Sequence, residues 1–258
     1  MELFSYIFLG IIQGLTEFLP VSSSGHLVLM QHFLQMTEDN LLFGTILHLG
    51  TACAILIVFR KDLQQIFTGL VSKDPIQRKD SWWYSLLIII GTVPAGFVGV
   101  FFKDSLEHLF TNPNAAGVML LATAGLLFFS ATRKSSTRSL TLGIAFLIGV
   151  SQALAIIPGI SRSGSTIATA LLLGIARPEA GRFSFMLALP AILGAVVLHV
   201  KDISTMNLPV AALVAGFITS FITGYFALRL LLHFVDRGKL FYFGYYCVAI
   251  ALLTIFFV

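Results

Sequence analysis

Hydroxyl and ionisable side chains interrupt long apolar runs at two places, and their types suit phosphate chemistry. The first stretch, residues 13–26, reads QGLTEFLPVSSSGH, and the second, residues 152–165, reads QALAIIPGISRSGS. A serine, a carboxylate and an arginine can together supply a nucleophile, a base and a phosphate ligand. The first stretch carries Glu17 and Ser23, and the second carries Arg162. These three side chains are therefore the candidates for a reaction centre.

The two polar stretches share a pattern that indicates two copies of one element. A shift of 139 positions superimposes identical residues: Gln13 on Gln152, Leu15 on Leu154, Ser22 on Ser161, Ser24 on Ser163 and Gly25 on Gly164. The same shift places Ser23 on Arg162 and Glu17 on Ile156, so the copies carry different chemical groups. A site that uses all of these groups needs both copies.

The composition predicts an all-α membrane protein as the scaffold for these groups. Hydrophobic residues make up 57% of the 258 residues and charged residues 11%, whereas soluble domains carry about 25% charged residues. Six apolar segments reach spanning length: 41–59, 82–102, 114–132, 180–200, 208–232 and 241–258. Cys53 and Cys247 fall inside such segments and are interpreted as small buried apolar residues.

The polar stretches lie in pairs of helices that are too short to cross a bilayer. Segments 3–18 and 22–36 would each extend about 24 Å at 1.5 Å per residue, against a hydrocarbon core of ~30 Å. A second short pair is predicted at 140–157 and 161–175. Each pair is typical of a re-entrant hairpin, and a single kinked span with a polar bend is the alternative.

The order of one hairpin and three spans occurs twice along the chain. We interpret residues 1–258 as a single membrane domain of two repeats, 1–135 and 136–258. Because three spans is an odd number, the second repeat must enter the membrane upside down. The predicted fold is therefore an inverted-topology repeat with six transmembrane helices and two re-entrant helical hairpins. Gly91 and Gly99 also match Gly216 and Gly224 at a shift of 125.

Basic residues are distributed unevenly between the predicted loops. With loop 60–81 in the cytoplasm, only Lys103 and Lys201 of the 16 basic residues face outward, and Arg162 lies in the second hairpin. The cytoplasmic set is Arg60, Lys61, Lys73, Arg78, Lys79, Arg133, Lys134, Arg138, Arg177, Arg182, Arg229, Arg237 and Lys239. Both termini are then outside, and the hairpins enter from opposite faces so that their polar tips can meet.

Each hairpin tip is expected to begin a half-helix that attracts anions. The first N–H groups of a helix lack intrahelical acceptors and its dipole end is positive, which favours phosphate. Ser22 and Ser161 are the predicted N-caps. Arg162 can hold phosphate through two parallel hydrogen bonds. The glycines that would let the backbone approach a ligand are Gly25, Gly159 and Gly164.

Three side chains of the first tip add reactive groups. Glu17 suits a divalent cation that bridges to phosphate oxygens, or a general base. Ser23 is the candidate nucleophile, and His26, on the same helix face, can pass protons. Plainer readings stay open: an ion pair of Glu17 with Arg162, a packing role for His26, caps alone at Ser22 and Ser161, hairpin hydrogen bonds at Ser24 and Ser163, and helix ties at Gln13 and Gln152.

The paired motifs resemble a known family over essentially the whole chain. Gln13-xxx-Glu17 followed by PVSSSGH, together with PGISRSG at 158–164, is similar to the undecaprenyl pyrophosphate phosphatases of the bacitracin-resistance type. The resemblance implies a bacterial cell-membrane enzyme that removes the terminal phosphate of the C55 isoprenoid pyrophosphate and regenerates the carrier lipid for cell-wall synthesis. It implies lipid partners and no nucleic acid, and it leaves a homodimer open.

Residue roles follow from this resemblance by motif position. Glu17, Ser23 and Arg162 would form the catalytic core, supported by His26, and activity would need Mg²⁺ or Ca²⁺. The implied substrate-binding residues are Gln13, Ser22, Ser24, Gly25, Ser161, Ser163 and Gly164. Many members have a glutamate where this chain has Gln13, so Glu17 would be the anionic metal ligand here.

A transporter or flippase of polyprenyl phosphates is the alternative function, because inverted repeats with broken helices are typical of transporters. The set of Ser23, Glu17 and Arg162 favours a phosphatase, since transport of an anion needs no carboxylate beside it. The two activities are compatible with each other. A passive structural role leaves the paired polar tips unexplained.

Overall fold

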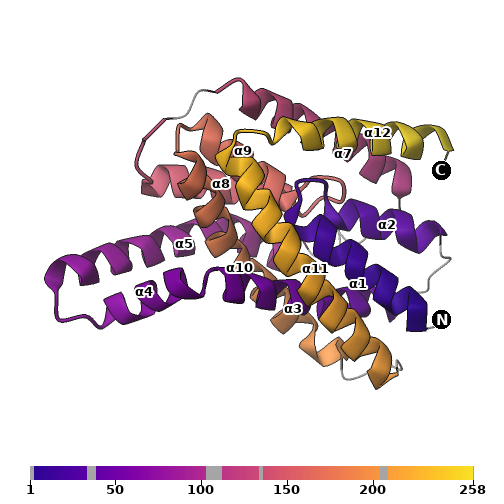
Figure 1. The fold of residues 1–258 in the computed structure, drawn as a ribbon, viewed down its shortest axis with the longest axis horizontal. Helices are drawn as coiled ribbons and strands as arrows, with labels where there is room; N and C mark the ends of the chain where they lie inside the picture. Colours follow the sequence, from indigo (N-terminus) through magenta and orange to yellow (C-terminus); the bar gives the residue numbers. More distant parts are fainter. Residues whose placement is uncertain (1–2, 34–38, 103–111, 134–135, 204–208, 258) are drawn as a thin grey trace.

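The computed structural model describes residues 3–33, 39–102, 112–133, 136–203 and 209–257, and this part of the chain is helical throughout (Figure 1). An isolated bridge between Arg138 and Ile175 is the one β-type pairing among these residues. The helices are α1 Leu3–Phe18, α2 Ser23–Phe33, α3 Asp39–Val58, α4 Arg60–Leu70, α5 Pro75–Phe101, α7 Pro113–Ala131, α8 Leu142–Leu154, α9 Arg162–Leu172, α10 Arg177–Ile203, α11 Val210–Asp236 and α12 Phe241–Phe257. The prediction of an all-α fold is confirmed.

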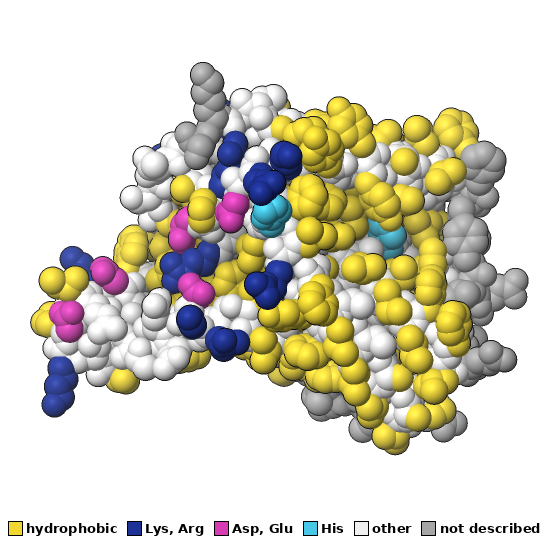
Figure 2. Space-filling model, in the orientation of Figure 1, with side chains coloured by type: hydrophobic (Ala, Val, Ile, Leu, Met, Phe, Trp, Pro, Cys, Tyr) yellow, Lys and Arg dark blue, Asp and Glu magenta, His cyan; other side chains and the backbone are white. Residues whose placement is uncertain are grey.

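Several of these helices are suited to a membrane. The helices α5, α7, α10 over Arg177–Val197, and α11 are long and apolar enough to cross one, and α3 with α4 forms a pair bent by 72°. In the described residues this makes four candidate spans, or five with the bent pair, whereas α12 has 17 residues. Large hydrophobic side chains cover much of the surface in Figure 2, as expected for lipid contact.

Residues 60–81, predicted as the connection between two spans, are mostly helical. Helix α4 fills its first half, and α5 begins at Pro75. Asp74 caps α5 by accepting a hydrogen bond from the Ile76 N–H at 3.0 Å, and proline is favoured in a first helical turn. Helix α5 has 27 residues, about 40 Å at the standard rise, so it is longer than the hydrocarbon core is thick.

The two predicted pairs of short helices are present as α1–α2 and α8–α9. Helix α1 packs on α11, and α8 packs on α5. Both contacts use glycine: a Cβ atom placed on Gly10 would collide with Thr219 and the Gly216 carbonyl, and one on Gly149 with the Gly91 backbone. Small residues at helix interfaces allow such close approach in membranes. Each hairpin is therefore held by a long helix from the other half of the sequence.

Charged side chains gather at one end of the molecule. Figure 2 shows the Lys and Arg side chains on the half that includes the α4–α5 turn, whereas hydrophobic side chains dominate the other half. The start of α1 and the end of α12 both lie away from the α4–α5 turn (Figure 1). Of the basic residues in the predicted distribution, Lys103 and Lys134 lie outside the described residues.

Candidate active site

The turns between the paired helices meet in the centre of the molecule, and we call residues 19–22 the first tip and residues 155–161 the second tip. Ser22 Oγ accepts from the Gly25 N–H at 3.2 Å, and Ser161 Oγ accepts from the Gly164 N–H at 3.1 Å. The predicted N-caps of α2 and α9 are thus confirmed. Ser22 has φ 66°, in the left-handed region that non-glycine residues seldom adopt.

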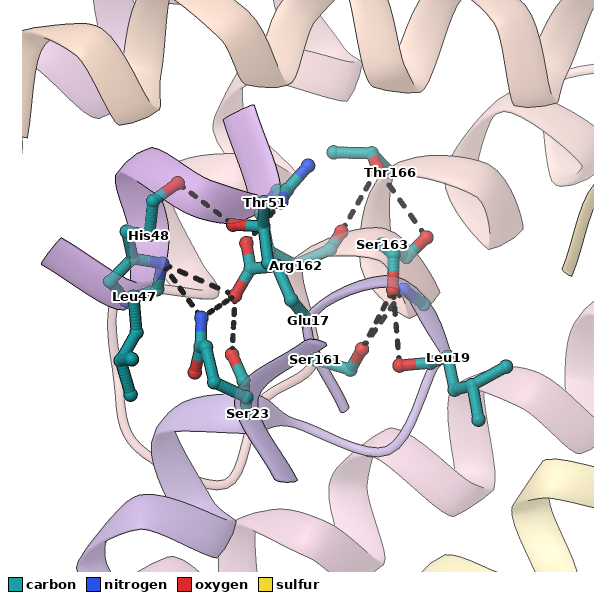
Figure 3. A network of polar contacts seen from close by, with 12 residues as sticks. Glu17, Leu19, Ser23, Leu47, His48, Thr51, Ser161, Arg162, Ser163 and Thr166 are labelled. Carbon is teal, nitrogen blue, oxygen red and sulfur yellow. Dashed lines mark hydrogen bonds and ion pairs between the residues drawn. The ribbon is translucent and has the colours of Figure 1, made fainter. Parts of the chain in front are cut away.

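Hydrogen bonds between the tips fix their relative position. Ser22 Oγ accepts from the Gly159 N–H at 3.1 Å. Ser163 Oγ, in the first turn of α9, donates to the Leu19 carbonyl of the first tip at 3.4 Å (Figure 3). Thr123 on α7 supports the second tip by donating to the Gly159 carbonyl at 2.8 Å. Gly25 lies against Gly159 so closely that a Cβ atom would be 3.2 Å from it. The two tips therefore form one rigid unit.

Glu17 is the centre of a group of polar side chains beside the tips (Figure 3). Its Oε2 accepts hydrogen bonds from Ser23 Oγ at 2.7 Å and from Gln13 Nε2 at 3.0 Å, and its Oε1 accepts one from Arg162 Nη2. The predicted meeting of Glu17, Ser23 and Arg162 is confirmed, although they come from α1, α2 and α9. Glu17 is 7% exposed, so these contacts replace most of the solvation of its charge.

His48 on α3 is a further member of this group that the sequence did not identify. Its Nδ1 lies 3.0 Å from Gln13 Nε2 and 3.4 Å from Glu17 Oε2. Because the Gln13 amide nitrogen is a donor, Nδ1 of the neutral ring accepts and Nε2 carries the hydrogen. A histidine inside an apolar span is itself a signal of function. We call Gln13, Glu17, Ser23, His48 and Arg162 the Glu17 cluster.

A cavity of about 820 Å³ opens beside the Glu17 cluster. This volume lies within the range of about 300–1,000 Å³ that is usual for ligand sites. The polar part of its wall includes Glu17, Ser23, Ser24, His48, Gln152, Ser161 and Arg162. The rest is mainly apolar and includes Leu27, Val28, Val100, Ile156, Leu193 and Val197. The cavity thus joins a small polar end to a long apolar surface.

The cavity wall separates the predicted substrate-binding residues into two groups. Ser24 and Ser161 belong to the wall, as predicted for substrate ligands. Gln13 is fully buried behind Glu17 and outside the wall, so it positions the carboxylate. The residues that join or support the tips instead of lining the cavity are Ser22, Gly25, Ser163 and Gly164.

His26 lies in a separate hydrogen-bonded pair. Its Nδ1 donates to the Ser22 carbonyl at 2.8 Å, which leaves Nε2 to accept from the Tyr246 hydroxyl at 2.9 Å. The ring stacks on that of Tyr246, with centroids 5.7 Å apart. His26 is buried and outside the cavity wall, so this geometry matches its plainer reading as a packing residue that steadies Ser22.

The donor set at the Glu17 cluster suits a divalent cation only with help from a ligand. No group of three or more His, Cys, Asp or Glu side chains among the described residues is arranged to hold a metal ion. Glu17 offers one carboxylate, and Gln13 Oε1 is a buried oxygen with no hydrogen-bond partner in the described chain. Mg²⁺ commonly takes one or two carboxylates and completes its shell with water and substrate phosphates. The residues therefore fit such an ion bound jointly with a phosphate ligand.

Comparison with known proteins places this site in a family. The family model described as bacitracin resistance protein BacA matches residues 6–253. Proteins named undecaprenyl-diphosphatase are similar over nearly their full length: that of Methanosphaera stadtmanae is 40% identical over 99% of this chain and 98% of its own. That of Christiangramia forsetii is 43% identical over 100% and 98%, respectively. The chain belongs to the bacitracin resistance protein BacA family.

Proposed function

We propose that the protein hydrolyses undecaprenyl diphosphate to the monophosphate and inorganic phosphate. The observation that carries this proposal is the hydrogen bond of 2.7 Å from Ser23 Oγ to Glu17, with Arg162 on the other carboxylate oxygen, at the polar end of an otherwise apolar cavity. The name shared by its relatives supports the substrate. Recycling of the carrier lipid by this reaction would confer resistance to bacitracin.

The Glu17 cluster supplies the groups for a two-step transfer. Ser23 Oγ attacks the terminal phosphorus and passes its proton to Glu17, while the bond from phosphorus to the bridging oxygen breaks. The lipid monophosphate leaves, and Glu17 releases its proton to solvent. Water then attacks the phosphoserine and gives a proton to Glu17. Free phosphate departs, and Ser23 recovers a proton from Glu17. Both enzyme residues thus return to their starting state.

Arg162 and His48 would stabilise the phosphate during these steps. Arg162 Nη2 is bound to Glu17, whereas Nη1 has no partner in the described chain and remains for a phosphate oxygen. The His48 side chain is 35% exposed at the cavity, and its Nε2–H can donate to another oxygen. Donors that are already positioned act on the developing charge without reorganisation.

A divalent cation, Mg²⁺ or Ca²⁺, would be held by Glu17 together with the phosphate oxygens of the substrate. It would neutralise charge on the phosphate oxygens. The Glu17 carboxylate would then bind the cation and also accept the proton of Ser23. Its two oxygens, with different partners, allow this division.

The apolar part of the cavity would accommodate the first isoprenoid units of the lipid. Branched aliphatic side chains line it, including Leu27, Val28 and Val197, and burying apolar surface there is favourable. The remainder of a C55 chain is far too long for this volume and would extend into the bilayer. The polar headgroup and the lipid tail are thereby directed to opposite parts of one site.

We also propose an inverted-topology repeat with six spans in the bacterial cell membrane and both termini outside. Matching contacts in the two halves support it. Gly10 meets Gly216, while their partners by sequence shift, Gly149 and Gly91, meet each other. The tips correspond as well: Ser22 pairs with Ser24 at 3.1 Å, and Ser161 pairs with Ser163 at 3.3 Å.

A flippase is the less favoured function for this site. Moving a lipid phosphate needs an anion site that changes its exposure, but it does not need a serine hydroxyl bonded to a carboxylate. Hydrogen bonds connect the two hairpins beside this site. The Ser23–Glu17 contact is therefore better explained by chemistry than by transport.

Phosphate release from C55 polyprenyl diphosphate by the purified protein in detergent tests the proposal. The parent protein should release one phosphate per substrate, and Ser23→Ala should lose nearly all turnover because the attacking oxygen is gone. Ser24→Ala is the matched control, since Ser24 is the adjacent serine and also lines the cavity but bonds to Ser22. A parent protein that releases no phosphate would refute the function.

The extent of loss in Ser23→Ala separates two mechanisms. Turnover within a few-fold of the parent would remove Ser23 from the reaction and leave a water activated by Glu17 as the attacking group. A loss of about 10- to 100-fold would fit one missing transition-state hydrogen bond instead of a missing nucleophile. Trapping of a phosphorylated Ser23 by rapid acid quench would distinguish covalent catalysis directly.

A further inference from the structure

Gln152 is a buried polar residue of the cavity wall that is not part of the Glu17 cluster. It lies near the end of α8 and is 2% exposed. Neither its Nε2 nor its Oε1 has a hydrogen-bond partner in the described chain. A buried amide without partners is unfavourable, and native proteins satisfy nearly all such groups. Among the described residues, the Gln152 amide is therefore left to bind a group from outside the chain.

The corresponding glutamine of the first half shows what Gln152 lacks. Gln13 donates to Glu17, four residues later, and to His48 on α3. A shift of 139 places Ile156 at the position of Glu17. A shift of 140, which aligns Lys61 and Asp62 with Lys201 and Asp202, places Ala188 at the position of His48. The second half thus keeps the amide and replaces both of its partners with apolar residues.

A second unpartnered donor lies in the same wall. Arg162 Nη1 is buried and has no hydrogen-bond partner in the described chain, and α9, which carries it, packs against α8. Ser161 lies between them in sequence and also lines the cavity. Guanidinium and amide N–H groups on one wall form a donor set for oxygen atoms of an anion. Phosphate has the oxygen atoms to satisfy both.

We propose that Gln152 binds the phosphate group that remains on the lipid, an inference that rests on the proposed function. Ser23 and Glu17 come from the first hairpin and meet the terminal phosphorus. In a displacement at phosphorus the entering and leaving oxygens are roughly in line. Gln152 and Ser161 of the second hairpin line the same cavity as Ser23 and Glu17, and we assign them to the phosphate that leaves.

The proposed contact suits the charge that develops as the bond breaks. Cleavage of the bridging bond gives the lipid phosphate an additional negative charge, which the Gln152 Nε2–H group can stabilise. The glutamine side chain has three rotatable bonds, so its amide can turn to the ligand while α8 stays in place. The two glutamines would then have distinct tasks: Gln13 orients Glu17, and Gln152 holds the product end of the substrate.

Inhibition constants of the two products provide the test. With Gln152→Leu, a C15 polyprenyl monophosphate should inhibit at least 10-fold more weakly, whereas inhibition by inorganic phosphate should change less than 2-fold. The kcat/KM value should fall at least 10-fold, and the melting temperature in detergent should stay level or rise because a buried orphan amide is gone. Gln152→Glu, which has the same shape but repels phosphate, should weaken the monophosphate further.

Matched measurements make each outcome decisive. Gln65→Leu removes an exposed glutamine on α4 and should leave all constants unchanged. Unchanged monophosphate inhibition in Gln152→Leu would overturn the proposal, as would a selective loss of inhibition by inorganic phosphate. If both Gln152 variants had a lower melting temperature and were inhibited equally more weakly by both products, the role of Gln152 would be structural, which would overturn the proposal. Each of these results assumes an active parent, so an inactive parent would refute the proposed function instead.

Discussion

Replacing Arg162 with lysine tests how the guanidinium group is used. Arg162 Nη2 contacts Glu17, and Nη1 has no partner in the described chain, so the two nitrogens can hold the carboxylate and a phosphate oxygen at once. Lysine keeps the charge but has one nitrogen at the end of a flexible chain. It can keep one of the two contacts and loses the geometry of the pair.

The expected loss follows from one charge-assisted hydrogen bond. Such a bond contributes about 1.5–3 kcal/mol, and each 1.36 kcal/mol corresponds to roughly a tenfold change in rate. Arg162→Lys should therefore lower kcat/KM for C55 polyprenyl diphosphate by about 10- to 150-fold. Phosphate release in detergent at saturating divalent cation measures it, with circular dichroism to confirm that the variant is folded.

Arg182→Lys is the control for this experiment. Arg182 forms an ion pair with Asp62 at 2.7 Å and lies over the Tyr84 ring, and it is outside the cavity wall. Its replacement should affect melting temperature more than turnover. A value of kcat/KM for Arg162→Lys within threefold of the parent would refute the reasoning, because Arg162 would then be a structural partner of Glu17 and no more.

Four further predictions use other parts of the molecule. Glu17→Gln should abolish the dependence of the residual activity on Mg²⁺ or Ca²⁺, measured by titration after chelation; an unchanged dependence would place the cation elsewhere. His48→Phe should reduce kcat/KM by about 10- to 100-fold, whereas His233→Phe, at an exposed histidine, should not. Gly149→Ala should destabilise the protein by about 1–3 kcal/mol, because its Cβ would lie 2.1 Å from the Gly91 carbonyl. Gly143→Ala on the same helix, with nothing within 4 Å, should not lower the melting temperature. In intact cells an impermeant thiol reagent should modify Asn114→Cys but not Lys73→Cys; the reverse pattern would invert the proposed topology.

The sequence revealed the reaction centre because polar residues are conspicuous in an apolar chain. Glu17, Ser23 and Arg162 stood out by composition, and the shift of 139 positions indicated which groups would meet. Helix α1 has the predicted bounds. Helix α4 was not predicted because its 11 residues are too few to span a membrane and include polar and charged ones.

The contact of His48 with the rest of the Glu17 cluster could not be predicted from the sequence. His48 reaches Gln13 across 35 residues and from another helix, and nothing in local spacing predicts that pair. The directions in which the Ser22 and Ser23 hydroxyls point could not be predicted from the sequence either. Ser22 and Ser23 are neighbours, yet the left-handed conformation at Ser22 helps to turn one hydroxyl to the second tip and the next to Glu17. The first hydroxyl joins the tips, and the second is the one for which we propose a chemical role.

The hydrogen bonds between the tips have a consequence for biogenesis. The Ser22 hydroxyl receives its hydrogen bond from Gly159, which is made 137 residues later. At elongation rates of about 5–20 residues per second, the first hairpin must wait on the order of ten seconds for its partner. During that interval its polar tip has no protein partner from the second half and needs water or the insertion machinery. Neither half is complete as a folding unit, so the nascent chain becomes an enzyme only when the second hairpin arrives.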